Sequence, residues 1–418
     1  MSFASEYLSS RVLYPPFISS DPDKDTGIIV IIPAFDEPGI CRVLDSLLLC
    51  TRPACGVEVI VHLNAASGAS DEELRRTLDS EKLISEWNGN NNPFFSLFCI
   101  NTLNNKSRDR GAGMARKVVM DEALYRFNTT GNAGGVILSL DADCSVSENY
   151  LVSVYSELLL HRERKACSLA FEHPVSGSEF DSEVYSAITA YELHLRYYYQ
   201  ALKYSGFPHV FHTVGSAFAV KALPYAAAGG MNRKQAGEDF YFIQKLIPMG
   251  GYFYLDSATV YPSPRISGRV PFGTGPLIRS MLEQGDTTMY TYNPLAFSAL
   301  GELFKSIPAI YDGESAALRE AEKHFKAPLV KFLEDEDWHK RMLEIRSNTS
   351  SRESFIKRFN NWFNMFKVVK FLNRVHSDGS YKKEPVELAA KKLLKTIGEP
   401  DCDYDMPGLL NKYRSLEH

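Results

Sequence analysis

Five short apolar runs, separated by helix-like segments, constrain the fold of this chain most strongly. The runs are GIIVIIP at 27–33, VEVIVHL at 57–63, FFSLFCI at 94–100, GVILSL at 135–140 and ACSLAF at 166–171. The segments between them place apolar residues at three- and four-residue steps, as amphipathic helices do. This alternation predicts an α/β fold with a mostly parallel sheet flanked by helices. Ligands of such sheets gather outside the carboxyl ends of the strands.

The pattern changes after Phe171. A helix candidate at 181–206 precedes an extended run at 209–220 and the glycine-rich turn AAAGGMNR, and from about Pro276 onward helical patterns dominate. We therefore expect four regions. They are an N-terminal arm at 1–26, a first half at 27–150, a second half at 151–275 that supplies the other wall of a cleft, and an all-helical C-terminal region at 276–418.

Composition excludes several classes of protein. The chain of 418 residues is 44% apolar and 23% charged, with a formal net charge of -5, which fits neither a basic nucleic-acid binder nor a disordered chain. Its apolar runs are too short to span a bilayer, so no transmembrane segment is expected. The first residues lack a basic region followed by an apolar stretch, and we expect a cytoplasmic protein.

The segment at 353–375 has the pattern of a basic amphipathic helix. Aromatic and aliphatic residues recur at three- and four-residue steps, and lysine and arginine side chains occupy other positions around the helix. Such a helix could make peripheral contact with a membrane surface. Packing onto the rest of the chain is the commoner arrangement and the one that we favour.

Two pairs of acidic residues follow predicted strands. Asp141 and Asp143 come after the run at 135–140, and Asp36 and Glu37 follow the first strand in PAFDEP. In an extended chain, residues two apart point the same way, so Asp141 and Asp143 could face one ligand. Carboxylate oxygens suit Mn²⁺ or Mg²⁺ shared with substrate phosphates, although a solvated turn would also contain aspartates.

Further charged residues lie near predicted helix ends or in loops. Arg116 lies in NNKSRDRGAGMARK, whose cations at a helix start could meet a diphosphate. Glu238 and Asp239 precede a helix, where they could stabilise its N-terminus or act as a general base. Arg265 and Arg269 occupy a loop rich in proline and glycine, which could contact a diphosphate or simply be solvated.

The order of these segments resembles that of the family 2 glycosyltransferases, which are inverting enzymes with the GT-A fold. The resemblance covers about Gly27 to Gly275 and is carried by IIVIIPAFDEP, VEVIVHLNAAS, GAGMARK, ILSLDAD, TVGSAFAVKALPYAAAGGM and GEDFYFIQKL. It implies that the half at 27–150 binds a nucleoside-diphosphate sugar and that the half at 151–275 binds an acceptor. A UDP or GDP sugar donor, a hydroxyl-bearing glycan or small-molecule acceptor, and Mn²⁺ or Mg²⁺ are the implied ligands.

The resemblance also assigns roles to individual residues. Asp141 and Asp143 match the D-x-D that binds metal and sugar nucleotide, Asp239 matches the catalytic base, and Arg116 matches an arginine that borders the nucleotide. Residues implied beside the nucleotide are Pro33, Ala34, Asp36, Glu37 and Asn64; those implied on the acceptor side are Gly215 and Gly230. Glu172 and His173, in FEHPVSG, could line the acceptor cleft or belong to a loop and the core.

Two departures from the family pattern affect the expected activity. The second strand continues as VHLNAAS where a D-D-x-S type sequence is usual, and the Q-x-x-R-W sequence of processive synthases is absent. We therefore expect transfer of a single sugar. A sugar-phosphate nucleotidyltransferase is one alternative, but the loop after its first strand should be glycine-rich and basic. The other alternative is a non-catalytic protein that binds sugar nucleotides or glycans.

Overall fold

The computed structural model describes residues 2–65, 68–91, 93–103, 111–234, 237–266, 273–312, 314–400 and 403–417. These residues form two compact units, which are described separately below. The first comprises Met1–Ile188 and Thr213–Asp286, and the second comprises Thr189–His212 and Thr287–His418. The first unit thus holds the region predicted at 27–150 and most of the region predicted at 151–275, whereas Thr189–His212, from within the latter, belongs to the second unit.

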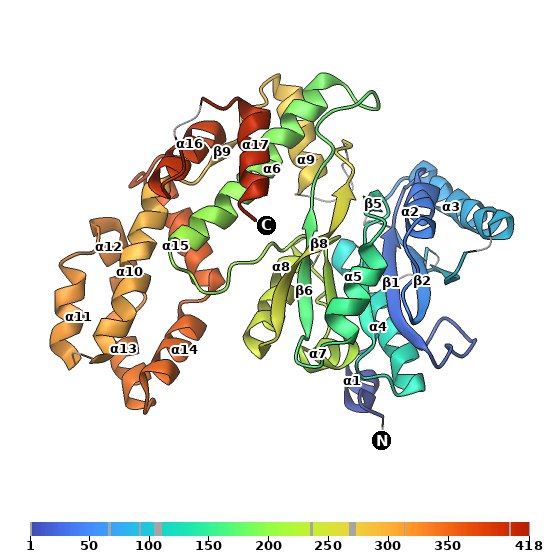
Figure 1. The fold of residues 1–418 in the computed structure, drawn as a ribbon, viewed down its shortest axis with the longest axis horizontal. Helices are drawn as coiled ribbons and strands as arrows, with labels where there is room; N and C mark the ends of the chain where they lie inside the picture. The colour runs from blue at the N-terminus through green and yellow to red at the C-terminus, as the bar shows by residue number, and fades with distance from the viewer. Residues whose placement is uncertain are drawn as a thin grey trace. The chain divides into compact units, whose positions relative to one another are not determined.

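The first unit contains a sheet of eight strands, which is ordered β3-β2-β1-β4-β7-β6-β8-β5. Strands β1, β2, β5, β6 and β8 of this sheet are labelled in Figure 1. The predicted apolar runs form β1 (Thr26–Ala34), β2 (Gly56–Leu63), β3 (Ser96–Asn101), β4 (Val136–Ser139) and β6 (Ala166–Phe171). Strands β3, β2, β1 and β4 run parallel to one another. The α/β fold with a largely parallel sheet is therefore confirmed.

The remaining strands all lie beyond β4 in the sheet. Strand β7 (Phe218–Lys221) runs antiparallel to β4 and β6, and β8 (Tyr252–Pro262) runs parallel to β6. Strand β5 (Cys144–Val146) pairs antiparallel with β8. Only the last part of the extended run predicted at 209–220 is a strand.

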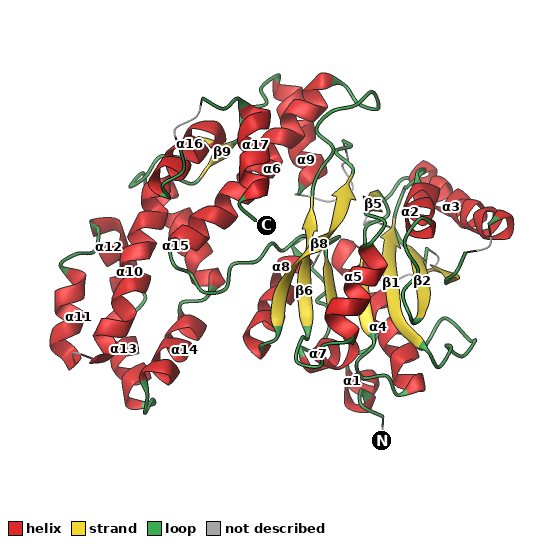
Figure 2. Ribbon diagram, in the orientation of Figure 1, coloured by secondary structure: helices red, strands yellow, loops and turns green. Residues whose placement is uncertain are grey.

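Helices pack against this sheet (Figure 2). Helix α4 (Ala112–Thr130) contacts β1 and β2, and α3 (Asp71–Asn90) contacts β2 and β3. The side chains of β1 from Ile28 to Ile32 are fully buried, as expected for a parallel strand covered on both faces. Other helices of this unit are α1 (Ser5–Ser10), α2 (Ile40–Leu48), α5 (Tyr150–Val154), α7 (Ala222–Ala227), α8 (Glu238–Leu246) and α9 (Thr274–Gln284).

The second unit is almost entirely helical. It takes most of α6 (Ser182–Tyr204), the helix predicted at 181–206, whose Arg196 is buried against Glu192 and Glu417. The other elements are β9 (Tyr290–Thr291), α10 (Pro294–Asp312), α11 (Glu314–Glu322), α12 (Ala327–Asp335), α13 (Trp338–Ser347), α14 (Arg352–Trp362), α15 (Met365–Ser377), β10 (Glu384–Pro385), α16 (Val386–Thr396) and α17 (Met406–Ser415). The C-terminal part of the chain is helical as predicted, apart from the two short strands β9 and β10.

The basic amphipathic segment at 353–375 forms two helices, α14 and α15, because Asn364 caps the second one through the backbone N–H groups of Phe366 and Lys367. Its apolar residues Phe355, Phe359, Val368 and Leu372 are buried within the unit. Most of the apolar face that a membrane would need is thus packed inside the protein, as favoured from the sequence, whereas Phe366 is exposed. Within the described ranges, no helix is long and apolar enough to cross a membrane.

Candidate active site at the carboxyl ends of the strands

The sheet has a topological switch point between β1 and β4. The chain passes from β1 to β2 and β3 on one side, then returns to β4 on the other side of β1. In open α/β sheets, ligands bind in the crevice at such a point, outside the carboxyl ends of the strands. Strand β1 ends just before Asp36 and Glu37, and β4 ends just before Asp141 and Asp143. Both predicted acidic pairs therefore lie at the expected edge.

Arg116 connects the strand ends to α8. Its side chain is buried, and it donates from Nη1 to Ser139 Oγ at 2.7 Å and to the Gly215 carbonyl at 3.0 Å. Nη2 donates to Asp141 Oδ1 at 3.0 Å, and Nε donates to Glu238 Oε1 at 3.2 Å. Burial lowers the pKa of Arg116, but the nearby carboxylates raise it above its ordinary value. The guanidinium is a fixed positive charge at the edge of the sheet.

Two glycines allow Arg116 to reach this position. At Gly113, in the first turn of α4, a Cβ would lie 2.2 Å from the Lys234 carbonyl oxygen. At Gly215, a Cβ would lie 2.8 Å from Arg116 Nη2 and 3.0 Å from Asp239 Oδ2. The G-A-G segment therefore brings α4 against the chain that leads to α8. Gly215 lies between the arginine and the predicted base.

Glu238 and Asp239 begin α8 but have different surroundings. Glu238 is buried and paired with Arg116, whereas Asp239 is partly exposed and its Oδ1 accepts the Phe240 N–H at 2.7 Å. Partial burial of the Asp239 carboxyl is the main cause that raises its pKa to about 7, and the charge of Glu238 adds to this shift. The charge of Arg116 opposes it. A general base works best with a pKa near the working pH. Asp239 is better suited to proton transfer than Glu238.

Asp141 and Asp143 lie on a turn between β4 and β5, so the extended geometry expected for D-A-D is wrong. The Cys144 N–H donates to the Asp141 carbonyl at 3.1 Å, which closes the turn. Asp141 pairs with Arg116, whereas Asp143 Oδ2 accepts from Arg265 Nε at 3.1 Å. The two carboxylates therefore contact different arginines.

Glu37 shares Arg265 with Asp143. The Arg265 guanidinium donates from Nη1 to Glu37 Oε1 at 3.1 Å and from Nη2 to Glu37 Oε2. Burial raises the pKa of Glu37 to about 7, and Arg265 opposes this shift. The structure thus joins the loops after β1, β4 and β8 through one guanidinium. Arg269, predicted to act with Arg265, lies outside the described residues, as does the basic segment before Gly111.

Asp36 has an unusual backbone conformation for a residue other than glycine. Its φ is +49°, a region that few such residues adopt. Its N–H donates to Thr77 Oγ1 at 3.0 Å, and its carboxylate accepts from Arg76 Nε at 2.6 Å and Nη2 at 3.0 Å. The first turns of α3 therefore hold this loop in place. Arg76 was not predicted, because its position in α3 suggests an ordinary surface residue.

The other predicted residues lie along or beside this unit's sheet. Pro33 pairs in register with His62, and the Asn64 N–H donates to the Ala34 carbonyl at 3.0 Å, so these residues lie where β1 and β2 end. The Glu172 N–H donates to the Val260 carbonyl at 2.9 Å, and His173 is buried with its ring against Phe171. Glu172 and His173 thus follow the end of β6.

Gly230 has a packing role. Its φ is +69°, and a Cβ there would lie 1.8 Å from Tyr7 Oη. Tyr7 Oη donates to Asp121 Oδ1 at 2.8 Å and accepts from Lys117 Nζ at 2.8 Å. Glycine at this position therefore lets α1 contact α4.

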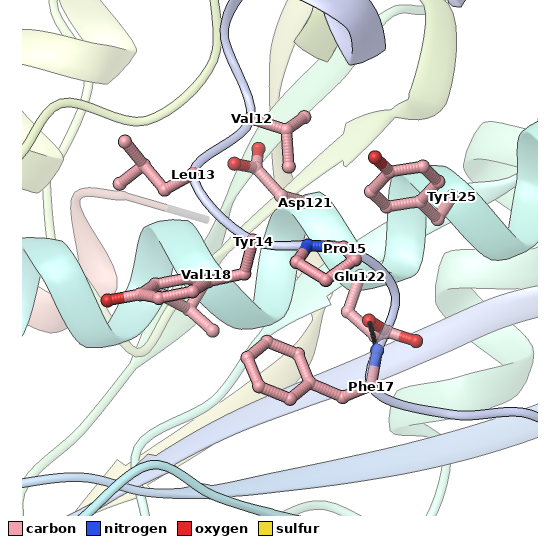
Figure 3. Close-up of a pocket in the computed structure, with 9 residues that line it drawn as sticks. All are labelled: Val12, Leu13, Tyr14, Pro15, Phe17, Val118, Asp121, Glu122 and Tyr125. Atoms are coloured by element: carbon pink, nitrogen blue, oxygen red, sulfur yellow. Dashed lines mark hydrogen bonds between the residues drawn. The ribbon is translucent and has the colours of Figure 1, made fainter. Parts of the chain in front are cut away.

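A small hollow lies between the N-terminal arm and α4 (Figure 3). Arm residues line one side of the hollow and residues of α4 line the other. They are Val12, Leu13, Tyr14, Pro15 and Phe17 from the arm, and Val118, Asp121, Glu122 and Tyr125 from α4. Glu122 accepts the backbone N–H groups of Phe17 and Ile18 at 2.8 and 3.1 Å. With room for about one water molecule, roughly 10 Å³, this hollow is too small for a sugar nucleotide.

The donor groups at the switch point suit a hard divalent cation. Asp141 and Asp143 have partly exposed carboxylates, with side-chain exposures of 37% and 27%. Among the described residues, no group of three His, Cys, Asp or Glu side chains could hold a metal ion by itself. Mg²⁺ and similar cations are commonly held by one or two carboxylates together with waters and substrate phosphates. The residues present fit that kind of site.

No family model matches the chain, and no curated protein matches it in sequence. Solved structures that it matches include S. aureus TarS 1–349 in complex with UDP-GlcNAc, at 12% identity and a TM-score of 0.40, with 66% of each chain covered. In another match to TarS 1–349, the chain spans 60% of that protein's length.

Two further matches come from other organisms. Mannosyltransferase PcManGT from Pyrobaculum calidifontis, in complex with GDP-Man and Mn²⁺, is 16% identical, with 87% of this chain and 93% of that chain covered and a TM-score of 0.36. Glucosyl-3-phosphoglycerate synthase from Mycobacterium tuberculosis is 14% identical, with 67% and 91% covered and a TM-score of 0.33. Likeness at this level decides neither the fold nor the activity of this chain.

Proposed function

We propose that this protein is a metal-dependent inverting glycosyltransferase of the GT-A type. It would move a single sugar from a nucleoside-diphosphate sugar to an acceptor hydroxyl. The observation that carries the proposal is the Arg116 cluster at the switch point. There, one buried guanidinium contacts Asp141 on the donor side and Glu238 beside Asp239. The cluster holds the groups that bind a diphosphate next to a carboxylate that can remove a proton.

The donor occupies the loops after β1, β2 and β4 in this proposal. Asp36 and Asn64 lie beside the nucleoside, which is of the UDP or GDP type, while Asp141 and Asp143 would hold Mn²⁺ or Mg²⁺. When bound, the cation would neutralise charge on the diphosphate. Arg116 and Arg265 provide further positive charge for the leaving group. Such preorganised charges stabilise a transition state because they need not reorient during the reaction.

Asp239 is the proposed base. Its carboxylate takes the proton from the acceptor hydroxyl as the acceptor oxygen forms a bond to the anomeric carbon. The bond from that carbon to the diphosphate oxygen breaks, and its electron pair leaves with the nucleoside diphosphate. Attack from the face opposite the leaving group inverts the configuration. Glu238 is a positioning residue, because it contacts Arg116 and its charge raises the pKa of Asp239.

The test combines UDP- and GDP-sugars with Mn²⁺ and a panel of hydroxyl-bearing acceptors, and it detects the glycoside and the released nucleotide. Asp239→Asn should lower kcat by about 10² to 10⁴ because it removes the base. Asp256→Asn, at an exposed position in β8, is the control and should retain full activity. Full activity in Asp239→Asn would remove that residue from the base role. Release of pyrophosphate would instead identify a nucleotidyltransferase, and binding without turnover would identify a non-catalytic protein.

The pH dependence follows from the raised pKa of Asp239. The group must be ionised to accept a proton, and its pKa in the folded protein is about 7. The value of kcat/KM for the wild type should therefore fall as the pH drops below about 7 and level off above it. A profile measured between about pH 5 and pH 9 checks this. A value that stays constant down to the ordinary range of an aspartate would contradict the proposed base.

A further inference from the structure

Arg265 bridges two carboxylates that come from different strand ends. Its Nε donates to Asp143 Oδ2 at 3.1 Å, and both of its terminal nitrogens donate to Glu37. The guanidinium therefore makes a two-point contact with Glu37 and a single contact with Asp143. Two-point contacts of this kind fix the orientation of an arginine more strongly than single ones.

The two carboxylates also differ in burial. The side chain of Glu37 is 5% exposed and also accepts the Gly39 N–H at 3.2 Å, whereas the side chain of Asp143 is 27% exposed. A buried carboxylate that loses its cation is strongly destabilised, while a partly exposed one can turn to water. Glu37 is thus the anchor for Arg265, and Asp143 is the partner that Arg265 can release more easily.

Asp143 is also the carboxylate assigned to the divalent cation in the proposed function, on which this inference rests. We propose that Glu37 positions Arg265 as a counter-cation of Asp143, so that Arg265 and the divalent cation compete for this carboxylate. A divalent cation beside a guanidinium is repelled by it, so the cation weakens the contact between Arg265 and Asp143. The released guanidinium can then donate to the donor's diphosphate while Glu37 still holds it nearby.

Arg76 offers a matched control. It also pairs with a carboxylate in the loop after β1, but its partner is Asp36, which the proposed function does not assign to the cation. General electrostatics predict that loss of either positive charge makes the loop more attractive to a cation. Direct competition for Asp143 predicts that loss of Arg265 raises the affinity for the cation more than loss of Arg76 does.

The experiment titrates MnCl₂ into the full-length protein without nucleotide and follows free Mn²⁺ by electron paramagnetic resonance. Arg265→Gln should bind Mn²⁺ roughly fivefold more tightly than the wild type, in line with the modest strength of partly exposed ion pairs. Arg265→Lys, which keeps the charge, should stay near the wild type, and Arg76→Gln should change affinity less than twofold. Thermal unfolding followed by circular dichroism confirms that each variant is folded.

A second titration separates competition from a general loss of function. With Mn²⁺ at saturation, Arg265→Gln should bind UDP or GDP several-fold more weakly than the wild type, because the diphosphate has lost a donor. The same substitution thus strengthens binding of the metal alone and weakens binding of the nucleotide. In a Glu37→Gln background, the effect of Arg265→Gln on Mn²⁺ affinity should shrink, because the guanidinium is no longer held at Asp143.

Equal Mn²⁺ affinities in Arg265→Gln, Arg76→Gln and the wild type would overturn the inference, as would Mn²⁺ binding too weak to detect in every variant. An undiminished effect of Arg265→Gln in the Glu37→Gln background would overturn the positioning role of Glu37. These outcomes are distinct from failure of the proposed function, which is read from glycoside formation. Transfer with unchanged Mn²⁺ affinities would leave the proposed function standing without the competition.

Discussion

Helix α4 carries two buried arginines that have different surroundings. Arg126 pairs with Glu58 through two hydrogen bonds, donates to the Ser20 carbonyl at 2.9 Å and lies over the Phe98 ring at 4.6 Å. Both side chains of that pair are 4% exposed. Arg116 contacts two carboxylates, a hydroxyl and a carbonyl, and its partner Asp141 has a side chain that is 37% exposed.

The difference separates a structural ion pair from a candidate site. The charges at Arg126 satisfy each other in the core, so this pair has no exposed carboxylate to offer a ligand. Buried partners hold the Arg116 guanidinium in place. It also contacts Asp141, whose carboxylate is partly exposed to solvent next to the partly exposed Asp239. Burial of a charge therefore identifies a site less well than the exposure of its partners does.

The largest expected effect is a loss of stability when Arg126 is replaced. Arg126→Met should lower the free energy of unfolding by about 3–5 kcal/mol, because it leaves Glu58 buried without a cation. Chemical denaturation of the variant and the wild type measures this loss. The activity of the folded fraction should not change. A loss well below 1 kcal/mol would show that Glu58 finds another partner and would weaken the contrast between the two arginines.

Replacement of Arg116 should lower the activity more than replacement of Arg126 does. Arg116→Lys keeps the charge but cannot donate to four acceptors in a fixed plane. We expect kcat to fall by about 10² to 10³, the usual cost of losing a preorganised donor. Steady-state kinetics and denaturation are measured on the same samples. The contrast fails if Arg116→Lys retains full activity, or if Arg126→Lys loses as much activity at equal stability.

His62, which contacts the residue before Arg116, makes the free energy of unfolding depend on pH. Its Nδ1 lies 2.9 Å from the Ala115 carbonyl and its Nε2 lies 2.9 Å from Thr102 Oγ1. Burial lowers the pKa of His62 from 6.5 to about 4. The folded protein therefore favours the neutral ring, which contributes stability above about pH 6.5 that is lost as the pH falls toward 4.

The loss of unfolding free energy attributable to His62 should approach about 3 kcal/mol, because each pKa unit corresponds to about 1.36 kcal/mol. Unfolding free energies of the wild type and His62→Gln between about pH 4 and pH 7 measure it. The stability of His62→Gln should depend less steeply on pH. Parallel curves for the two proteins would show that other groups cause the acid sensitivity.

The smallest expected effect comes from Gly215. In Gly215→Ala, the added methyl group would press on Arg116 and Asp239, so we expect a stability loss of about 1–3 kcal/mol. Activity should fall about tenfold, which corresponds to about 1.4 kcal/mol in the barrier. Gly134→Ala is the matched control, because a Cβ there meets only Asn132 Oδ1, at 3.8 Å. Equal results for the two variants would remove Gly215 from the cluster.

The sequence predicts the strands with continuous apolar runs, because β1, β2 and β4 are buried on both faces. It did not predict β5, which has three residues, or β8, whose pattern is mixed and whose partners β6 and β5 lie far away in the chain. These strands form through long-range pairing, so local periodicity carries little information about them.

The candidate site, like the sheet, was predicted from the sequence only in part. Acidic pairs after strands and the G-E-D segment indicated the residues that the structure brings to one edge. The sequence could not predict which carboxylate each arginine contacts, because Arg116 and Glu238 meet only after α4 and α8 pack together. It also missed Ser139, which reads as one more residue of a buried strand although its hydroxyl contacts Arg116.

The most direct test of the central claim is calorimetric titration of UDP and GDP, with Mn²⁺ present, into the wild type, Asp143→Asn and Asp239→Asn. We predict that one of the nucleotides binds the wild type and Asp239→Asn with similar affinity. Asp143→Asn should bind it at least about tenfold more weakly, because the diphosphate and its cation lose a carboxylate. Failure of both nucleotides to bind the wild type, or equal affinity in Asp143→Asn, would contradict a sugar-nucleotide site at the carboxyl ends of these strands.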